Sequence, residues 1–162
     1  MATEITALPK LYIGIDIHKK SWSVHIRTDI SDHKNFTVPS DPSVVYDYVN
    51  KHFMGYQVAL TYEAGCCGFS AARYFMQMGW EVMVVNPADV PTNNKQYYQK
   101  TDALDCRNLS RQLSLGELKG IFVPDEREDE LKSLLRHRAA ITRQLRTAKT
   151  HIKSFLLYQG IK

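Results

Sequence analysis

The chain has 162 residues, 44% of them hydrophobic, which is enough for one domain with a buried core and too little for two full ones. Its apolar runs fall short of the roughly 18 to 20 residues of a membrane helix, and residues 1–10 lack the basic start and apolar centre of a signal peptide, so a cytoplasmic protein without membrane association is expected. The net charge of +4 conceals an asymmetry, because all 17 acidic residues precede residue 131.

The first three predicted elements are strands. Residues 11–16 (LYIGID) form a short apolar run that ends in a carboxylate, and residues 21–27 (SWSVHIR) alternate between polar and apolar positions. Residues 35–38 form a third short run that closes before Pro39. We expect these runs to be antiparallel strands connected as hairpins.

Helices and strands are then predicted to alternate. Asp41 followed by a proline is typical of the start of a helix. Residues 57–62 (QVALTY) have the β-branched and aromatic content of a strand and run directly into Glu63. A second helical pattern stops at Gly79, and residues 81–85 (EVMVV) predict a buried strand.

A loop separates this part from a third predicted helix. Pro, Asn, Thr and Asp dominate residues 88–96, which indicates the loop. Apolar residues return at helical spacing from about Thr101 and stop at Gly116. We expect Leu104 and Leu109 to anchor this helix to the core.

The chain is predicted to end in one long helix. Residues 118–123 are expected to be a short extended piece, and residues 126–158 then contain no Gly or Pro. The apolar positions of this stretch approximate the three-then-four spacing of a helical hairpin or coiled-coil seam, which Arg138 interrupts. These positions are Leu131, Leu134, Ile141, Leu145, Ala148, Ile152 and Phe155.

The order of the elements predicts the fold class. Hairpin-connected strands followed by alternating helices and strands make an α/β fold, with a mixed sheet flanked by helices, and this order is that of the RNase H-like (RuvC-like) fold. We expect the nuclease-like domain to cover residues 9–124. Residues 125–162 are expected to form a basic amphipathic helix, a linker or dimerisation segment at the start of a C-terminal region that this chain lacks.

Four acidic residues occupy positions that suggest a common site. Asp16 ends an apolar run, where a buried carboxylate is costly unless it is paired or bound to a metal. If the strand that ends at Glu63 is its parallel neighbour, both acids lie at the same edge of the sheet. Asp102 and Asp105 are three residues apart and share one helix face. Each acid alone also fits a turn, a cap or a solvated face, but their combined placement favours one site.

An acidic cluster of this kind predicts a metal ion. Neighbouring carboxylates raise each other's proton affinity, so the cluster is stable at neutral pH mainly when a divalent cation neutralises it. Oxygen-only ligands select a hard cation, Mg²⁺ or Mn²⁺. Because two such ions can activate water and stabilise the leaving oxygen of a phosphodiester, the predicted substrate is nucleic acid.

Three blocks of sequence carry these acids: YIGIDIHKK, TYEAG and QKTDALDCRNLS. Together they resemble the signature blocks of the DEDD-type insertion-sequence transposases, a family that includes the Piv-type DNA invertases. The resemblance implies that the catalytic and metal-binding acids are Asp16, Glu63, Asp102 and Asp105. Lys100 and Thr101 match the usual lysine-threonine lead-in, and Cys106 replaces a small alanine with little change in volume.

The resemblance also implies an activity. Members carry a RuvC-like domain that binds divalent metal, usually continue into a domain with a serine nucleophile, and together these domains cut and rejoin DNA. Some relatives choose their sites through a structured guide RNA. We therefore expect a metal-dependent DNA transposase or recombinase domain, completed by a serine domain that is absent here, with full recombination not expected from the isolated domain.

Three other classes were weighed against this one. The sugar-kinase and actin-like ATPase fold can also open with IGID, but here HKK stands where its phosphate-binding turn would follow, and the chain is too short for its two lobes. A RuvC-type Holliday-junction resolvase shares the fold and the metal chemistry. A non-catalytic nucleic-acid-binding or dimerisation module would fit the basic C-terminal segment.

That segment predicts a polyanionic partner. After Glu130 there are 8 of the 21 Lys and Arg residues and no acid, which leaves 13 basic residues against 17 acids in the preceding part. Such a bias favours contact with DNA, although a solvated helix face is the simpler alternative. The resemblance adds that this helix joins two domains and helps to build dimers or higher homo-oligomers. Its candidate nucleic-acid contacts are Arg136, Arg143, Arg146 and Lys149.

Three further residues flank the acids and are candidate nucleic-acid contacts. His18 lies two residues after Asp16, so on a continuing strand it would face the same side and could reach the metal or a phosphate. It could instead support the site from outside or lie on the surface. Lys19 and Lys100 could hold phosphates.

Overall fold

The computed structural model describes residues 8–90 and 102–161, and for Asp102 it describes the backbone alone. The chain divides into two compact units, Met1–Val123 and Pro124–Lys162. The elements described are, in chain order, β1 (Lys10–Ile17), β2 (Ser21–Thr28), β3 (Asp32–Pro39), α1 (Pro42–His52), β4 (Gln57–Glu63), α2 (Ser70–Gln77), β5 (Glu81–Val85), a 3₁₀ turn η1 (Pro87–Asp89), α3 (Asp102–Leu115) and α4 (Glu126–Tyr158).

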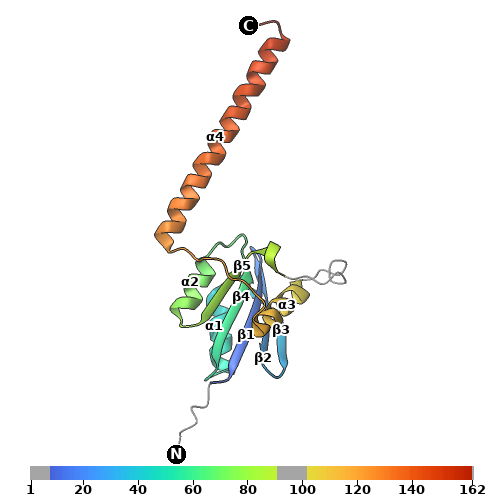
Figure 1. The fold of residues 1–162 in the computed structure, drawn as a ribbon, viewed down its shortest axis with the longest axis vertical. Helices are drawn as coiled ribbons and strands as arrows, with labels where there is room; N and C mark the ends of the chain where they lie inside the picture. The colour runs from blue at the N-terminus through green and yellow to red at the C-terminus, as the bar shows by residue number, and fades with distance from the viewer. Residues whose placement is uncertain (1–7, 91–101, 162) are drawn as a thin grey trace, which may run out of the picture. The chain divides into compact units, whose positions relative to one another are not determined.

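The five strands form one mixed sheet in the order β3-β2-β1-β4-β5 (Figure 1). The first three strands pair antiparallel, whereas β1–β4 and β4–β5 are parallel pairs. The RNase H-like class predicted from the element order is thereby confirmed. The other strands match the predicted runs to within one residue at each end, but β3 begins at Asp32 rather than Asn35. The extended piece predicted at 118–123 is limited to one bridge between Val85 and Gly120.

Helices cover both faces of this sheet. The core on one face combines Leu11, Ile13 and Ile15 of β1 with apolar residues of α1 and α2, such as Val45 and Phe75. Helix α3 packs on the other face, across β1 and β2 (Figure 1). Strand residues that alternate away from the first core therefore face α3 rather than solvent.

The predicted start of α1 is confirmed in detail. Asp41 has an extended backbone, and its carboxylate accepts hydrogen bonds from the backbone N–H and the hydroxyl of Ser43, at 2.9 and 2.7 Å. Pro42 occupies the first turn, where its missing N–H costs nothing. This cap fixes the point at which the chain leaves β3 and turns onto the first face of the sheet.

The second unit consists largely of α4, and the single long helix predicted for residues 126–158 is confirmed. The Asp125 carboxylate accepts a hydrogen bond from the backbone N–H of Glu128 at 2.7 Å, and three acids in the first turn complement the helix dipole. Every residue of α4 is at least partly exposed. None of the helices in the described part of the chain is both long and apolar enough to cross a membrane.

Candidate metal centre

Gly14 determines how closely α3 approaches the sheet. A Cβ atom at this position would lie 2.6 Å from the backbone N of Ser110 and closer still to the carbonyl oxygen of Cys106. Both atoms belong to the backbone of α3, which therefore rests directly on β1. The sequence analysis did not single out this glycine, although a glycine inside a strand pattern is the usual signal of close backbone approach.

Asp16 and Glu63 lie at the same end of two adjacent parallel strands: Glu63 is the last residue of β4, and Asp16 is the last but one of β1, one residue earlier than predicted. The register of β1 and β4 pairs Ile15 with Tyr62, so the residues that follow in each strand stand side by side at the same sheet edge. Because Ile15 and Tyr62 are buried in the core on the first face, alternation turns the two acids to the face that α3 covers. Both acids are partly buried.

His18 contacts Asp16 directly. Its Nε2 lies 3.2 Å from Oδ2 of Asp16, and the two side chains are 53% and 22% exposed. Strand β1 ends at Ile17, so His18 does not lie on a continuing strand and is held in the turn before β2. Lys19, in the same turn, is exposed. This arrangement places His18 where it can orient the Asp16 carboxylate.

Helix α3 begins at the paired aspartates. Asp105 is partly buried, and the charges of Asp16 and Asp105 both act on the buried thiol of Cys106. Burial is the main reason why the pKa of Cys106 rises to about 12, and Asp16 is the next largest cause. Asp16 of β1 and the first turns of α3 are therefore close neighbours. Lys100 and the side chain of Asp102 lie outside what the structure describes.

The anchors of α3 differ in part from the prediction. Leu109 is buried as expected, but Leu104 is 37% exposed and does not anchor the helix. Cys106 and Ser110, both fully buried, take that place against Gly14. Cys106 is buried, as expected for a residue that replaces a small alanine.

The donor set at this sheet edge fits a hard cation, because it offers carboxylate oxygens from two strands. Among the side chains that the structure describes, no three His, Cys, Asp or Glu groups are already gathered at metal-binding distance. Asp16, Glu63 and Asp105 are therefore not gathered around one point among these described side chains. The side chain of Asp102 is not one of them, so the four-acid site stays a prediction.

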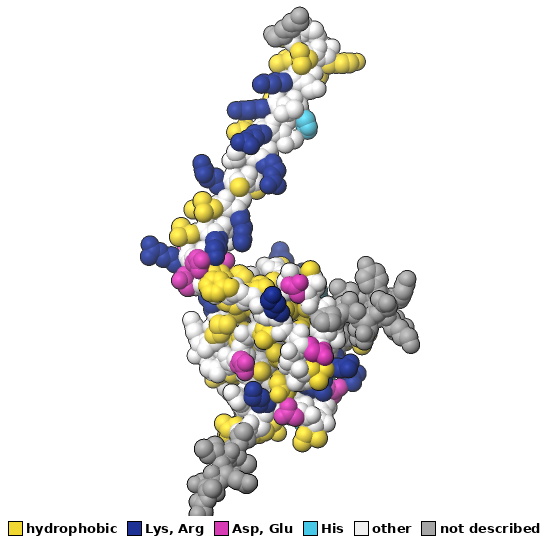
Figure 2. Space-filling model, viewed as in Figure 1, with side chains coloured by type: hydrophobic (Ala, Val, Ile, Leu, Met, Phe, Trp, Pro, Cys, Tyr) yellow, Lys and Arg dark blue, Asp and Glu magenta, His cyan; other side chains and the backbone are white. Residues whose placement is uncertain are grey.

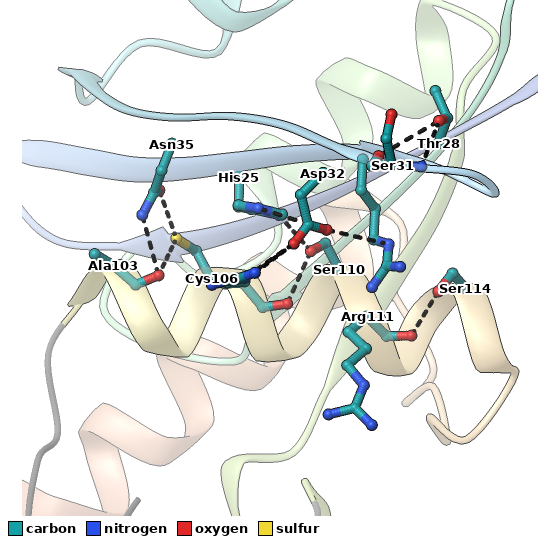
Figure 3. A network of polar contacts seen from close by, with 12 residues as sticks. His25, Thr28, Ser31, Asp32, Asn35, Ala103, Cys106, Ser110, Arg111 and Ser114 are labelled. Atoms are coloured by element: carbon teal, nitrogen blue, oxygen red, sulfur yellow. Dashed lines mark hydrogen bonds and ion pairs between the residues drawn. The ribbon is translucent and has the colours of Figure 1, made fainter.

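A polar cluster joins α3 to the β2–β3 hairpin, and the sequence analysis missed it (Figure 3). Ser110 Oγ donates to the carbonyl oxygen of Arg107 at 2.9 Å and accepts from Nδ1–H of His25 at 2.7 Å. Asn35 donates to the carbonyl oxygen of Ala103 at 3.2 Å. Although a serine, a histidine and an acid meet here, Ser110 is fully buried, so the cluster acts as a clamp and not as a nucleophile.

An ion pair completes this clamp. Nε and Nη2 of Arg107 donate to Oδ2 of Asp32 at 3.0 and 2.6 Å. Burial alone would raise the pKa of Asp32, but the hydrogen bond and charge of Arg107, with weaker help from His25 and Arg27, hold this pKa below its usual value. Asp32 is therefore ionised at neutral pH and ties β3 to α3.

The clamp makes the stability of the protein depend on pH. Burial lowers the pKa of His25 below its ordinary value of 6.5; the charge of Asp32 opposes this shift, and those of Arg107 and Arg27 add to it. Because the folded state disfavours the proton, the stabilisation from neutral His25 is present above pH 6.5 and is lost as the pH falls from there toward the lower folded pKa. We expect the urea midpoint to fall between pH 7 and 5, and this slope to weaken in His25→Gln.

An exposed histidine of α4, His151, offers the control for this measurement. His151→Gln should keep the slope of the parent protein. The same slope in His25→Gln would show that other groups cause the pH dependence.

Comparison with known proteins supplies a family match. Residues 13–159 match the model of a DEDD transposase family of insertion sequences, the IS110 type, described as transposase. Two proteins of Sinorhizobium fredii named as transposases, y4qE and y4rJ, are 34% and 33% identical over 103 and 106 residues, which are 64% and 61% of this chain. The transposase of insertion sequence element IS1533 of Leptospira borgpetersenii is 25% identical over 158 residues, or 94% of this chain.

The chain spans less than half the length of these curated relatives. The matched part amounts to 26% of each Sinorhizobium protein and 45% of the Leptospira protein. The matched residues 13–159 include all four predicted acids and the whole of α4.

Proposed function

Because the chain belongs to the DEDD transposase family of insertion sequences, we propose that it is the metal-dependent DNA-cleaving domain of such a transposase. The observation that carries the proposal is the parallel register of β1 and β4, which sets Asp16 beside Glu63 at one sheet edge under α3. If these acids served only in a turn or on a solvated face, they would not need to stand side by side on adjacent strands.

In this proposal Asp16, Glu63, Asp102 and Asp105 hold Mg²⁺ or Mn²⁺. Such ions would activate water and stabilise the leaving oxygen of a phosphodiester. His18 fixes the orientation of the Asp16 carboxylate through its 3.2 Å contact, as residues behind metal ligands commonly do. Lys19 and Lys100 are proposed to contact phosphates beside the acids. The close fit of α3 over Gly14 supports this proposal, because it brings the helix that carries Asp105 against the strand that carries Asp16.

Strand exchange would need more than this chain. We include in the proposal a serine-bearing domain that completes the active site, and a structured guide RNA that selects the target. A RuvC-type resolvase differs from this proposal in one testable respect, because it would cleave a Holliday junction without another domain. The match to transposases favours the first reading.

Helix α4 is proposed to serve two roles. Its apolar positions keep the three-then-four spacing of a coiled-coil seam, and side chains such as Leu134 and Leu145 are more than half exposed, at 66% and 53%. A helix of this length with no buried residue gains little from packing within its own chain, so a second copy would stabilise it. Arg136, Arg143, Arg146 and Lys149 are proposed DNA contacts, and Lys and Arg side chains line the helix beyond its acidic start (Figure 2).

The metal site is tested by calorimetry with Mn²⁺. We expect Glu63→Gln to weaken Mn²⁺ binding by at least roughly tenfold, because a neutral amide replaces a charged ligand. Glu81→Gln is the matched control, since Glu81 is exposed at the opposite end of the neighbouring strand β5. Identical titrations for the two variants would contradict the proposed site.

A further inference from the structure

A cavity opens on α3 apart from the acids. Its volume is about 410 Å³, and it lies between α3 and the β2–β3 hairpin. We call it the arginine pocket, and its lining residues are Arg27, Asp32, Leu104, Arg107, Asn108 and Arg111. The positions on α3 lie three, four and seven residues after Leu104, so they form one stripe along the helix.

Positive charge exceeds negative charge in this pocket. Three arginines and a single carboxylate, that of Asp32, line the pocket, so the lining carries two unbalanced positive charges. Arg107 is hydrogen-bonded to the Asp32 carboxylate, whereas Nε of Arg27 lies 3.7 Å from Oδ1 of Asp32.

The guanidinium group of Arg27 has hydrogen-bonding capacity to spare. The Nε atom of Arg27 is buried and has no hydrogen-bond partner among the described residues. The Arg111 side chain extends away from the clamp (Figure 3). A buried donor without an acceptor is unusual in a folded protein and marks a position where a ligand acceptor would be favourable.

The pocket and the acids occupy different sides of the same helix. At about 100° per residue, Arg111 lies roughly 120° around the helix axis from Asp105. A nucleic-acid strand that reaches the acids could therefore meet the pocket as it passes around α3.

We infer that the arginine pocket binds a backbone phosphate of the nucleic acid that the acidic site acts on. Guanidinium groups suit this role because their planar fork matches the oxygens of a phosphate. The inference rests on the proposed function for the identity of the ligand, but it does not require the metal. Arg107 holds the clamp together and Arg111 does not, so Arg111 is the residue to change.

The test measures binding of the full chain to a labelled DNA duplex, in EDTA and over a range of salt concentrations. We expect Arg111→Gln to lower affinity about fivefold at low salt and to reduce the slope of log K against log[salt] by about 1. Arg111→Lys, which keeps the charge but not the planar fork, should restore the salt slope and recover only part of the affinity. Lys51→Gln, an exposed change on α1, removes the same charge outside the pocket and should have little effect.

The outcomes separate this inference from the metal site. An RNA duplex of the same sequence and inorganic phosphate serve as further probes; equal losses on DNA and RNA would support recognition of the backbone. If the Arg111→Gln and Lys51→Gln variants bind each nucleic acid with the same affinity, the inference is wrong. Binding of inorganic phosphate alone would not rescue it. A Glu63→Gln variant that loses Mn²⁺ binding but binds DNA normally in EDTA would leave the pocket supported. If the calorimetry detects no metal site, the effect of Arg111→Gln on DNA binding in EDTA would still stand.

Discussion

Gly14→Ala is expected to destabilise the first unit by about 3 kcal/mol, the upper range for overpacking a well-filled core. The added methyl group would overlap the backbone of α3 at Cys106 and Ser110, and a backbone cannot move aside as a flexible side chain can. The helix would have to lift from β1, which would also break the hydrogen bond between Ser110 and His25. Because Asp105 moves with α3, Mn²⁺ binding should weaken in the fraction that stays folded.

Tryptophan fluorescence during thermal unfolding measures this effect. Trp22 and Trp80 are the only tryptophans and both are buried in the first unit, so the signal does not depend on α4. A loss of this size corresponds to a decrease in Tm on the order of 10 °C. Gly65→Ala is the matched control, because a Cβ there would meet nothing closer than the Glu63 carbonyl oxygen at 3.7 Å. Equal Tm values for the two variants would refute the role given to Gly14.

The sheet-edge acids could be predicted from the sequence because their signal is local. An apolar run that ends in Asp16 and another that ends in Glu63 indicate where two strands stop. The parallel register then follows from the order of the elements, since a strand reached through a crossover helix lies parallel to its neighbour. The start of α3 at Asp102 followed from helical spacing in the same way.

The clamp could not be predicted because its partners are distant in the chain. His25 and Ser110 are 85 residues apart, and Asp32 and Arg107 are 75 apart. The alternation in residues 21–27 indicates one apolar and one polar face, and a polar face is ordinarily exposed to solvent. Here α3 covers that face, and His25 is 3% exposed. Only the tertiary packing of a helix over the second face turns these polar residues into a buried network.

Leu104 illustrates the same limit. Helical spacing groups it with Leu109 as an apolar anchor, but the close approach at Gly14 rotates Cys106 and Ser110 toward the sheet. Leu104 then lines the arginine pocket instead of the core. The residue that decides this rotation is a glycine, which has no side chain to appear in a hydrophobic pattern.

Ile141→Asp combined with Leu145→Asp is expected to convert a dimer into a monomer of 18.6 kDa. Both side chains lie in the proposed seam of α4 and are half exposed, at 50% and 53%. Burying carboxylates in a coiled-coil seam costs several kcal/mol, and about 4 kcal/mol already weakens the dimer roughly 1,000-fold. Sedimentation at micromolar concentration would measure the loss.

The control for this prediction adds the same two charges elsewhere on the helix. Ala139 and Ala140 lie outside the three-then-four positions, so Ala139→Asp combined with Ala140→Asp should remain dimeric. Circular dichroism should show that α4 stays helical in the control, whereas the seam variant should lose helicity, since an unpartnered helix of this composition is marginal in water. Dissociation in both double variants would mean that charge, not the seam, governs association, and α4 would then have to be stabilised by something other than a second copy.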